Sequence, residues 1–118
     1  MPPKLPEEEV WSRIRSLWKK TVYTIDTRQP YEIKGTTSEI IIIENRNVRP
    51  HRGDVYRVYL RLHEDGYVAN DNMPKRIVKP GQSLRIILAI LAAILPDEIE
   101  IFAKGRAKGI RFKEQTED

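Results

Sequence analysis

The sequence predicts one compact α+β domain with a mainly antiparallel sheet of about five strands and helices packed on it. A chain of 118 residues fits a single domain with one hydrophobic core. Apolar residues recur at helical spacing in some segments and alternate strictly in others, so both element types are expected. The segments follow in the order α-β-β-β-α-α-β-β, in which consecutive strands with short connections pair antiparallel. We expect residues 1–118 to form this domain, with frayed ends at about 1–6 and 114–118.

The charge balance of the chain is basic, but only slightly. The sequence has 21 Lys and Arg against 17 Asp and Glu, a net charge of +4 and a pI near 9.4. Nucleic-acid binding needs a basic face, and net charge alone does not show one. The absence of cysteine excludes disulfides, cysteine-held zinc and cysteine catalysis. No motif indicates a cofactor.

No segment predicts secretion or a membrane span. The first residues carry prolines and acidic side chains instead of the apolar core of a signal peptide. The most apolar run, residues 84–95, contains Arg85 and is shorter than the roughly 20 residues that cross a bilayer. We therefore expect a cytoplasmic location and no membrane partner.

Residues 7–20 are expected to form the first helix. Pro6 suits a helix start, and three glutamates then place negative charge at the N-terminal end. An apolar stripe at helical spacing follows, made of Val10, Trp11, Ile14, Leu17 and Trp18. The two tryptophans share one helical face, which favours a place in the core, with a partner surface as the alternative.

Three strands are expected next. Residues 21–25 and 31–35 consist of β-forming or alternating residues and flank the turn Arg28-Gln29-Pro30, so they predict a hairpin. Residues 38–44 include four consecutive isoleucines, which predict a strand covered on both faces and central in the sheet.

The second helix is expected to begin at Gly53, with Asp54 as its cap, and to end at Gly66. The prolines and polar turn formers of residues 67–81 predict a loop, the segment we expect to move most, with one short strand at 76–78.

The last third of the chain predicts a helix and a second hairpin. Ser83 is the expected cap of a buried helix over residues 84–95, which lies against the sheet and stops at Pro96. Strands at 98–103 and 110–113 then flank a glycine-containing turn.

Five arginines follow the isoleucine strand and continue into the second helix: Arg46, Arg49, Arg52, Arg57 and Arg61, with His51 among them. Guanidinium groups bind phosphates through paired hydrogen bonds, and free amides at a helix start add to the same field. These arginines are therefore candidate nucleic-acid contacts. The competing interpretation is a solvated loop and helix face, because arginines one turn apart usually face water and Asp54 stands where a phosphate would bind.

The tip of the second hairpin is a further basic element, with Lys104, Arg106, Lys108, Arg111 and Lys113. It resembles the wing of winged-helix proteins, and this resemblance implies contacts with a nucleic-acid backbone. Phe102 and Phe112 could stack on bases, although phenylalanines on alternating strands more often belong to the core. If the hairpin and the arginine segment share one face, the local field exceeds what the net charge suggests.

Asp26, Glu32 and Lys34 form another candidate group. Strand alternation places Glu32 and Lys34 on one face, and the hairpin could bring Asp26 beside them. The arrangement resembles the catalytic strands of the PD-(D/E)xK nucleases, whose core has a similar order of helix, three strands and helix. The resemblance implies that these residues hold Mg²⁺ and a water for phosphodiester hydrolysis. It covers residues 26–34 only, and an ordinary solvated strand face is the alternative.

Metal and nucleophile sites of other kinds find no support. His51 and His63 lack the spacing of metal ligands. The serines lack the glycine-flanked turn expected of a nucleophile; they include Ser12, Ser16, Ser38 and Ser83.

The favoured function is a small non-enzymatic nucleic-acid-binding or regulatory module that contacts phosphates through the arginine segment and the hairpin. The first alternative is a protein-interaction or oligomerisation module, in which the tryptophans or the apolar helix meet a protein partner or a second copy. The second alternative is the Mg-dependent nuclease.

Overall fold

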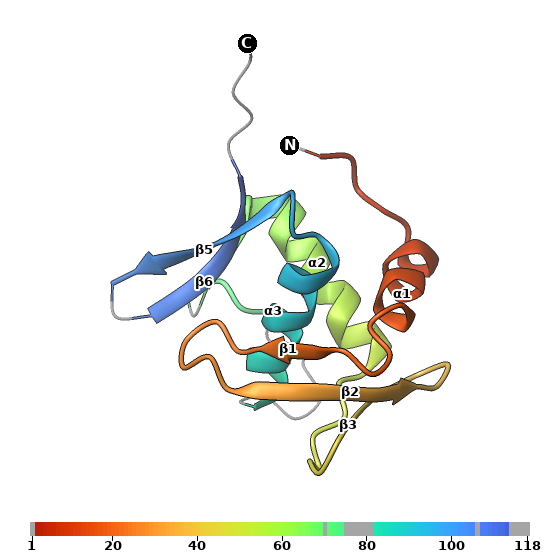
Figure 1. Cartoon of the computed structure of the whole chain (residues 1–118). Coiled ribbons are helices and arrows are strands. Elements are labelled where there is room, and N and C mark those ends of the chain that lie inside the picture. The colour runs from red at the N-terminus through yellow and green to blue at the C-terminus, as the bar shows by residue number, and fades with distance from the viewer. Residues whose placement is uncertain (1, 70, 75–81, 106, 114–118) are drawn as a thin grey trace.

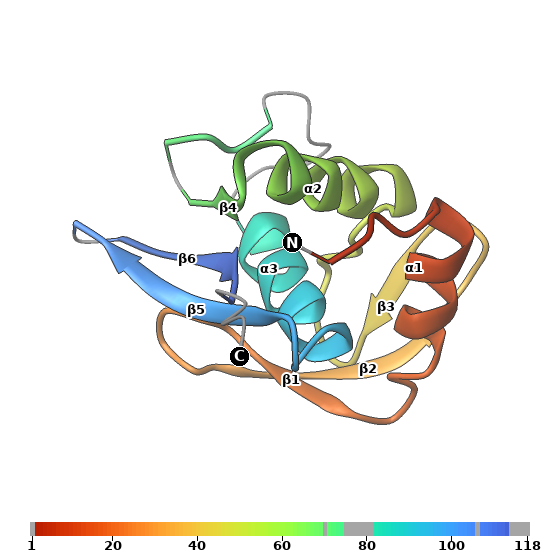
Figure 2. The ribbon, with the colours of Figure 1, turned by 90° about the horizontal axis from the view of Figure 1, so that it is seen from above.

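A buried helix lies at the centre of the molecule, and two antiparallel sheets and two further helices surround it (Figure 1, Figure 2). The computed structural model describes residues 2–69, 71–74, 82–105 and 107–113, without the side chains of residues 82, 83, 104 and 107. Its elements are α1 (Glu7–Arg15), β1 (Thr21–Tyr23), β2 (Pro30–Thr36), β3 (Ile41–Ile43), α2 (Arg52–Asp65), β4 (Tyr67–Val68), α3 (Gln82–Ile94), β5 (Ile99–Lys104) and β6 (Ala107–Phe112).

The predicted α+β class is confirmed, but the predicted single sheet of about five strands is two sheets of three. The strand orders are β1-β2-β3 and β4-β6-β5. Alternating residues reveal strands and their hairpins, whereas they do not reveal whether two hairpins join edge to edge. Here β1 and β5 each remain at the end of their own sheet.

Helix α1 is shorter than the predicted helix over 7–20. After Arg15 the chain turns, and Lys19 adopts a left-handed φ of 63° that reverses its direction. Trp11 is 1% exposed and donates its indole N–H to the Thr37 carbonyl at 3.3 Å, whereas Trp18 is 60% exposed. The expected core position is therefore wrong for Trp18, because the helix that would align the two rings ends between them.

The first sheet buries one face against the core. The β1–β2 hairpin is confirmed, with Val22 opposite Tyr31, and both side chains are buried. The isoleucine strand β3 pairs with β2 at the end of this sheet, so its predicted central place is wrong. Its outer edge is covered by the extended chain that enters α2, where the Ile41 N–H donates to the Pro50 carbonyl at 2.9 Å.

Helix α2 begins at Arg52, and His51 occupies its cap position without a side-chain hydrogen bond. Asp54 is not the cap, because its buried carboxylate pairs with Arg57 within the helix. The predicted end at Gly66 is confirmed: its φ of 79° suits a residue without a side chain, and its N–H donates to the Leu62 carbonyl at 2.8 Å.

The segment before α1 is fastened to α2. The Leu5 N–H donates to the Tyr59 hydroxyl at 2.8 Å, and the Tyr56 hydroxyl donates to the Leu5 carbonyl at 3.0 Å. Two hydrogen bonds therefore hold the entering chain against α2. The predicted frayed end at 114–118 lies outside the described residues.

Helix α3 supplies the centre of the core, as its apolar sequence predicts. Its residues from Ile86 to Leu91 are all buried, and Pro96 follows its end. The predicted hairpin after it is confirmed as β5 and β6, with Ile101 opposite Ile110. The predicted strand at 76–78 and the cap at Ser83 lie outside the residues or side chains that the structure describes.

Strand β4 is the one element in the described residues that the sequence did not indicate. Val68 pairs with Ile110 of β6, and Gly109 lets the two strands approach closely, since a Cβ there would lie 2.3 Å from the Val68 carbonyl oxygen. A strand of two residues is too short to show alternation, so it cannot be predicted from the pattern.

Candidate nucleic-acid interface

Two of the five predicted arginines, Arg46 and Arg49, lie exposed on the loop between β3 and α2. The Arg46 guanidinium lies 5.1 Å from the centroid of the Tyr31 ring, which holds its position without neutralising its charge. Within the described part of the chain neither arginine takes part in an ion pair. Both therefore carry charge that a phosphate could meet.

Arg52 belongs to the fold instead. Its side chain is only 17% exposed, it donates to Glu8, and its Nε lies 3.7 Å from Glu7. Its guanidinium also lies 5.5 Å from the centroid of the Trp11 ring. The hydrogen bond to Glu8 raises the pKa of Arg52. These contacts join α1 to the start of α2, so Arg52 is already engaged.

Arg57 and Arg61 point along α2 toward carboxylates. Arg57 Nη1 lies 3.1 Å from Asp54, and Arg61 lies 3.8 Å from Glu64 and 3.9 Å from Asp65. Their charge is therefore partly balanced within the helix.

In the basic hairpin, too, some cations are engaged with other groups and others are exposed. Arg111 Nε lies 2.8 Å from Glu100, and its guanidinium packs 5.0 Å from the centroid of the Phe102 ring. Lys113 donates to the Pro96 carbonyl at 3.2 Å, and Lys108 is exposed. Arg106 and the side chain of Lys104 are not described. Phe112 belongs to the core, as expected, and Phe102 packs edge-on against Tyr67.

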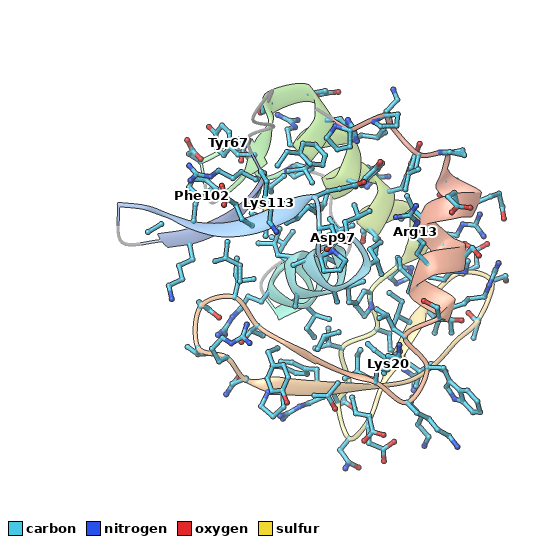
Figure 3. All side chains as sticks on the ribbon, turned by 45° about the horizontal axis from the view of Figure 1, so that its top comes forward. Arg13, Lys20, Tyr67, Asp97, Phe102 and Lys113 are labelled. Carbon is cyan, nitrogen blue, oxygen red and sulfur yellow. The ribbon has the colours of Figure 1, made fainter. Side chains whose placement is uncertain are left out.

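The loop that carries Arg46 and Arg49 lies apart from the hairpin, whereas the C-terminal end of α2 packs near β4 and β6. In Figure 1 strands β5 and β6 extend to the left, whereas the loop after β3 lies at the bottom and α2 starts on the right. Figure 3 likewise places Phe102 and Tyr67 beside the hairpin and Lys20 on the opposite side, below α1. Helix α3 directly precedes the wing-like hairpin in the sequence, but it is buried and does not extend the surface of the hairpin.

The structure does not assemble the nuclease-like group. Asp26 lies in the β1–β2 turn, 2.9 Å from Arg85, whereas Glu32 lies opposite Thr21 near the other end of β1. Burial alone would raise the pKa of Asp26, but the hydrogen bonds from Arg85 and the Thr27 backbone outweigh it and lower that pKa. Lys34 faces solvent, 3.8 Å from Glu44. The three side chains therefore have separate surroundings.

Sequence reasoning missed a set of exposed aromatic rings that carry cations. Lys19 Nζ lies 4.5 Å from the centroid of the Trp18 ring, and Arg28 lies 5.2 Å from that of Tyr23, which is 46% exposed. The available signal was the order of residues: Trp18 and Lys19 are adjacent at the end of a helix, and Arg28 shares a hairpin with Tyr23.

Cations without an ion pair gather around the first sheet in the described part of the chain. We call them the first-sheet basic surface; they are Arg15, Lys19, Lys20, Arg28, Arg46 and Arg49. Two carboxylates of the same sheet region, Asp26 and Glu44, are already paired with Arg85 and Lys34. The exposed Glu32 and Glu39 offset part of this charge, so the region keeps an excess of positive charge smaller than its six cations suggest.

Other kinds of site can be surveyed over the same residues. Among the described residues no three His, Asp or Glu side chains lie together as metal ligands would, and none of the described helices has the length and apolarity to span a bilayer. No protein-family model matches the chain, and neither a curated protein nor a solved structure does.

Proposed function

We propose that the chain is a small non-enzymatic nucleic-acid-binding or regulatory module that contacts phosphates through the first-sheet basic surface. The supporting observation is the packing of three cations on aromatic rings of this region: Lys19 on Trp18, Arg28 on Tyr23 and Arg46 on Tyr31. A cation held on a ring keeps its full charge and loses little freedom when a phosphate binds. The cytoplasm is the expected location of such a module.

The predicted contacts divide into two groups under this proposal. Arg46 and Arg49 belong to the first-sheet basic surface, whereas the hairpin cations Lys104, Arg106, Lys108, Arg111 and Lys113 form a second contact point elsewhere. Arg52 has a structural role, and the balanced Arg57 and Arg61 add less to the field. Only variants can separate the two contact points.

The test is the binding of labelled single-stranded and duplex oligonucleotides, followed by fluorescence anisotropy. Affinity should fall steeply as salt rises from about 50 to 200 mM, because bound phosphates release counterions. The double variant Arg46→Glu with Arg49→Glu should weaken binding and flatten the salt slope by roughly two units.

The charge-matched comparison is Lys108→Glu with Lys113→Glu. It changes the net charge equally, so a smaller loss in this variant assigns the main contact to the first sheet. Unmeasurable binding of the unmodified protein at the lowest salt would end the proposal.

Self-association is a second candidate function, and one observation favours it. Tyr23 and Ile101, both exposed, line the same hollow of ≈ 340 Å³, which Ala89, Ala92 and Ala93 of α3 also line. This hollow lies beside β1 and β5, the end strands of the two sheets, and open strand edges pair readily with a second copy. Light scattering should then show a dimer that Ile101→Glu converts to monomer; a monomer at every concentration excludes it.

A further inference from the structure

Trp18 is the most exposed of the large apolar side chains that the structure describes, and its turn holds it in place. The Lys19 N–H donates to the Ile33 carbonyl at 2.8 Å, and the Lys20 N–H donates to the Leu17 carbonyl at 2.8 Å. Leu17 is buried on the inner side of the same turn. The ring therefore projects from a fixed base, so a ligand that meets it has little disorder to remove.

A hollow of ≈ 310 Å³ lies beside this ring. Its lining is Arg15, Trp18, Ile33, Gly35 and Thr36. The pairing of β2 with β3 shifts by one residue between Ile33 and Gly35, and no atom lies within 4 Å of where a Gly35 side chain would begin. The lining of the hollow thus includes an aromatic ring and open space above Gly35, which together suit a flat ring.

The segment that carries Trp18 is positively charged, while Glu32, beside Ile33 on β2, is exposed. Residues 15–20 contain Arg15, Lys19 and Lys20 and no acidic residue. Lys19 lies over the Trp18 ring, and Arg15 lines the hollow. A flat ring attached to a chain of negative charges complements this arrangement. An apolar protein segment would offer no negative charge to pair with the three cations.

We propose that the hollow beside Trp18 binds an unpaired nucleobase of single-stranded nucleic acid, with the neighbouring phosphates on Arg15, Lys19 and Lys20. The base stacks on the indole of Trp18. Duplex bases are stacked on one another and cannot present a face to the ring, so the site selects single strands. This inference rests on the proposed function and names its ligand.

The two tryptophans provide a direct readout. Trp11 is buried and Trp18 is exposed, so a stacked base should quench the fluorescence of Trp18 alone. The probe is oligothymidylate of about 12 nucleotides, a length within the usual range of single-strand sites, and its duplex with oligodeoxyadenylate is the comparison. Quenching should occur with the single strand and be much weaker with the duplex.

Variants of Trp18 test the same contact by affinity. Trp18→Ala should weaken single-strand binding about tenfold or more and change duplex binding by less than about twofold, whereas Trp18→Phe should retain part of the affinity. Leu84→Ala is the control, because Leu84 is a partly buried apolar residue of α3 that lines neither hollow and should leave both affinities unchanged. Far-ultraviolet circular dichroism confirms that each variant is folded.

Each result decides something. If the unmodified protein binds neither strand form, the proposed function fails and this inference falls with it. If the unmodified protein binds both strand forms without quenching of Trp18 fluorescence, and Trp18→Ala binds them equally well, only this inference is overturned. A change in Trp18 fluorescence with protein concentration alone assigns the ring to a second copy of the chain and also overturns it.

Discussion

Arg52 shows how a single residue in a predicted binding segment can belong to the fold. Its guanidinium meets Glu7, Glu8 and the ring of Trp11, and so joins two helices. Arg52→Ala should lower the midpoint of thermal unfolding by a few degrees, whereas Arg49→Ala, on the exposed loop, should leave it unchanged. Equal midpoints for the two variants would contradict the structural role. Differential scanning calorimetry provides the comparison.

His63 should make stability depend on pH. Its ring packs between Tyr59 and Phe112, with both centroid distances at 4.8 Å, and its Nε2 lies 2.9 Å from the Tyr59 hydroxyl. Burial and the charge of Lys4 lower the pKa of His63, while the charge of Glu98 opposes them.

Because the pKa of His63 is lower in the folded protein than in the unfolded chain, protonation favours unfolding. The contribution of neutral His63 to the free energy of unfolding should be complete above about pH 6.5, the ordinary pKa of histidine. As the pH falls from about 6.5 to the folded-state pKa, the free energy of unfolding should decrease. Urea titrations on both sides of pH 6.5 measure this. His63→Gln should lose less stability on acidification, and an unchanged pH dependence would argue against this origin.

At the scale of elements, alanine substitutions at two glycines should change stability in opposite directions. Gly53 lies exposed in α2 with no atom within 4 Å of the place of a Cβ, so Gly53→Ala should stabilise by about 0.5–1 kcal/mol. At Gly109 the added Cβ would lie 2.3 Å from the Val68 carbonyl oxygen, so Gly109→Ala should destabilise by roughly 1–3 kcal/mol. Urea denaturation measures both. Destabilisation at both sites would mean that α2 does not have the described geometry.

The elements themselves could largely be predicted, but their boundaries and neighbours could not. The spacing of apolar residues indicates α3 and both hairpins because those segments are long enough to show a period. Helix α1 ends at Arg15 and the chain reverses at Lys19 in a left-handed conformation, which the residue types of this segment do not predict. The edge position of β3 depends on the chain near Pro50 covering it, a contact that an isoleucine run cannot reveal.

At the scale of the whole molecule, α3 makes one core of two sheets. Leu91 is fully buried in the single cluster that joins both sheets and all three helices of the described residues. Leu91→Ala should cost about 2–5 kcal/mol, and far-ultraviolet circular dichroism and tryptophan fluorescence should report the same midpoint. Ile101→Ala, at an exposed site, is the control and should lower the free energy of unfolding only slightly. Two separate midpoints would show that the sheets unfold independently.

The candidate site was less predictable than the fold, because the free charge of a cation depends on residues that are distant in the sequence. Sequence identifies where cations are dense, as around Arg49 and Lys108, but their free charge depends on which carboxylates fold beside them. Arg111 meets Glu100 only through strand pairing, and Arg52 meets Glu8 across two helices. Near Trp18 the cations Arg15, Lys19 and Lys20 take part in no ion pair among the described residues, although the sequence prediction had singled out the other two segments.

The central place of α3 has a consequence for synthesis in the cell. Strands β1, β2 and β3 leave the ribosome well before α3, so the core that they share with α1 and α2 lacks its central helix until α3 follows. Newly made protein emerges at roughly 5–20 residues per second, so these strands wait for seconds with apolar side chains open to water. Ile41 and Ile43, both buried in the folded protein, are among the side chains that stay in contact with water during this time.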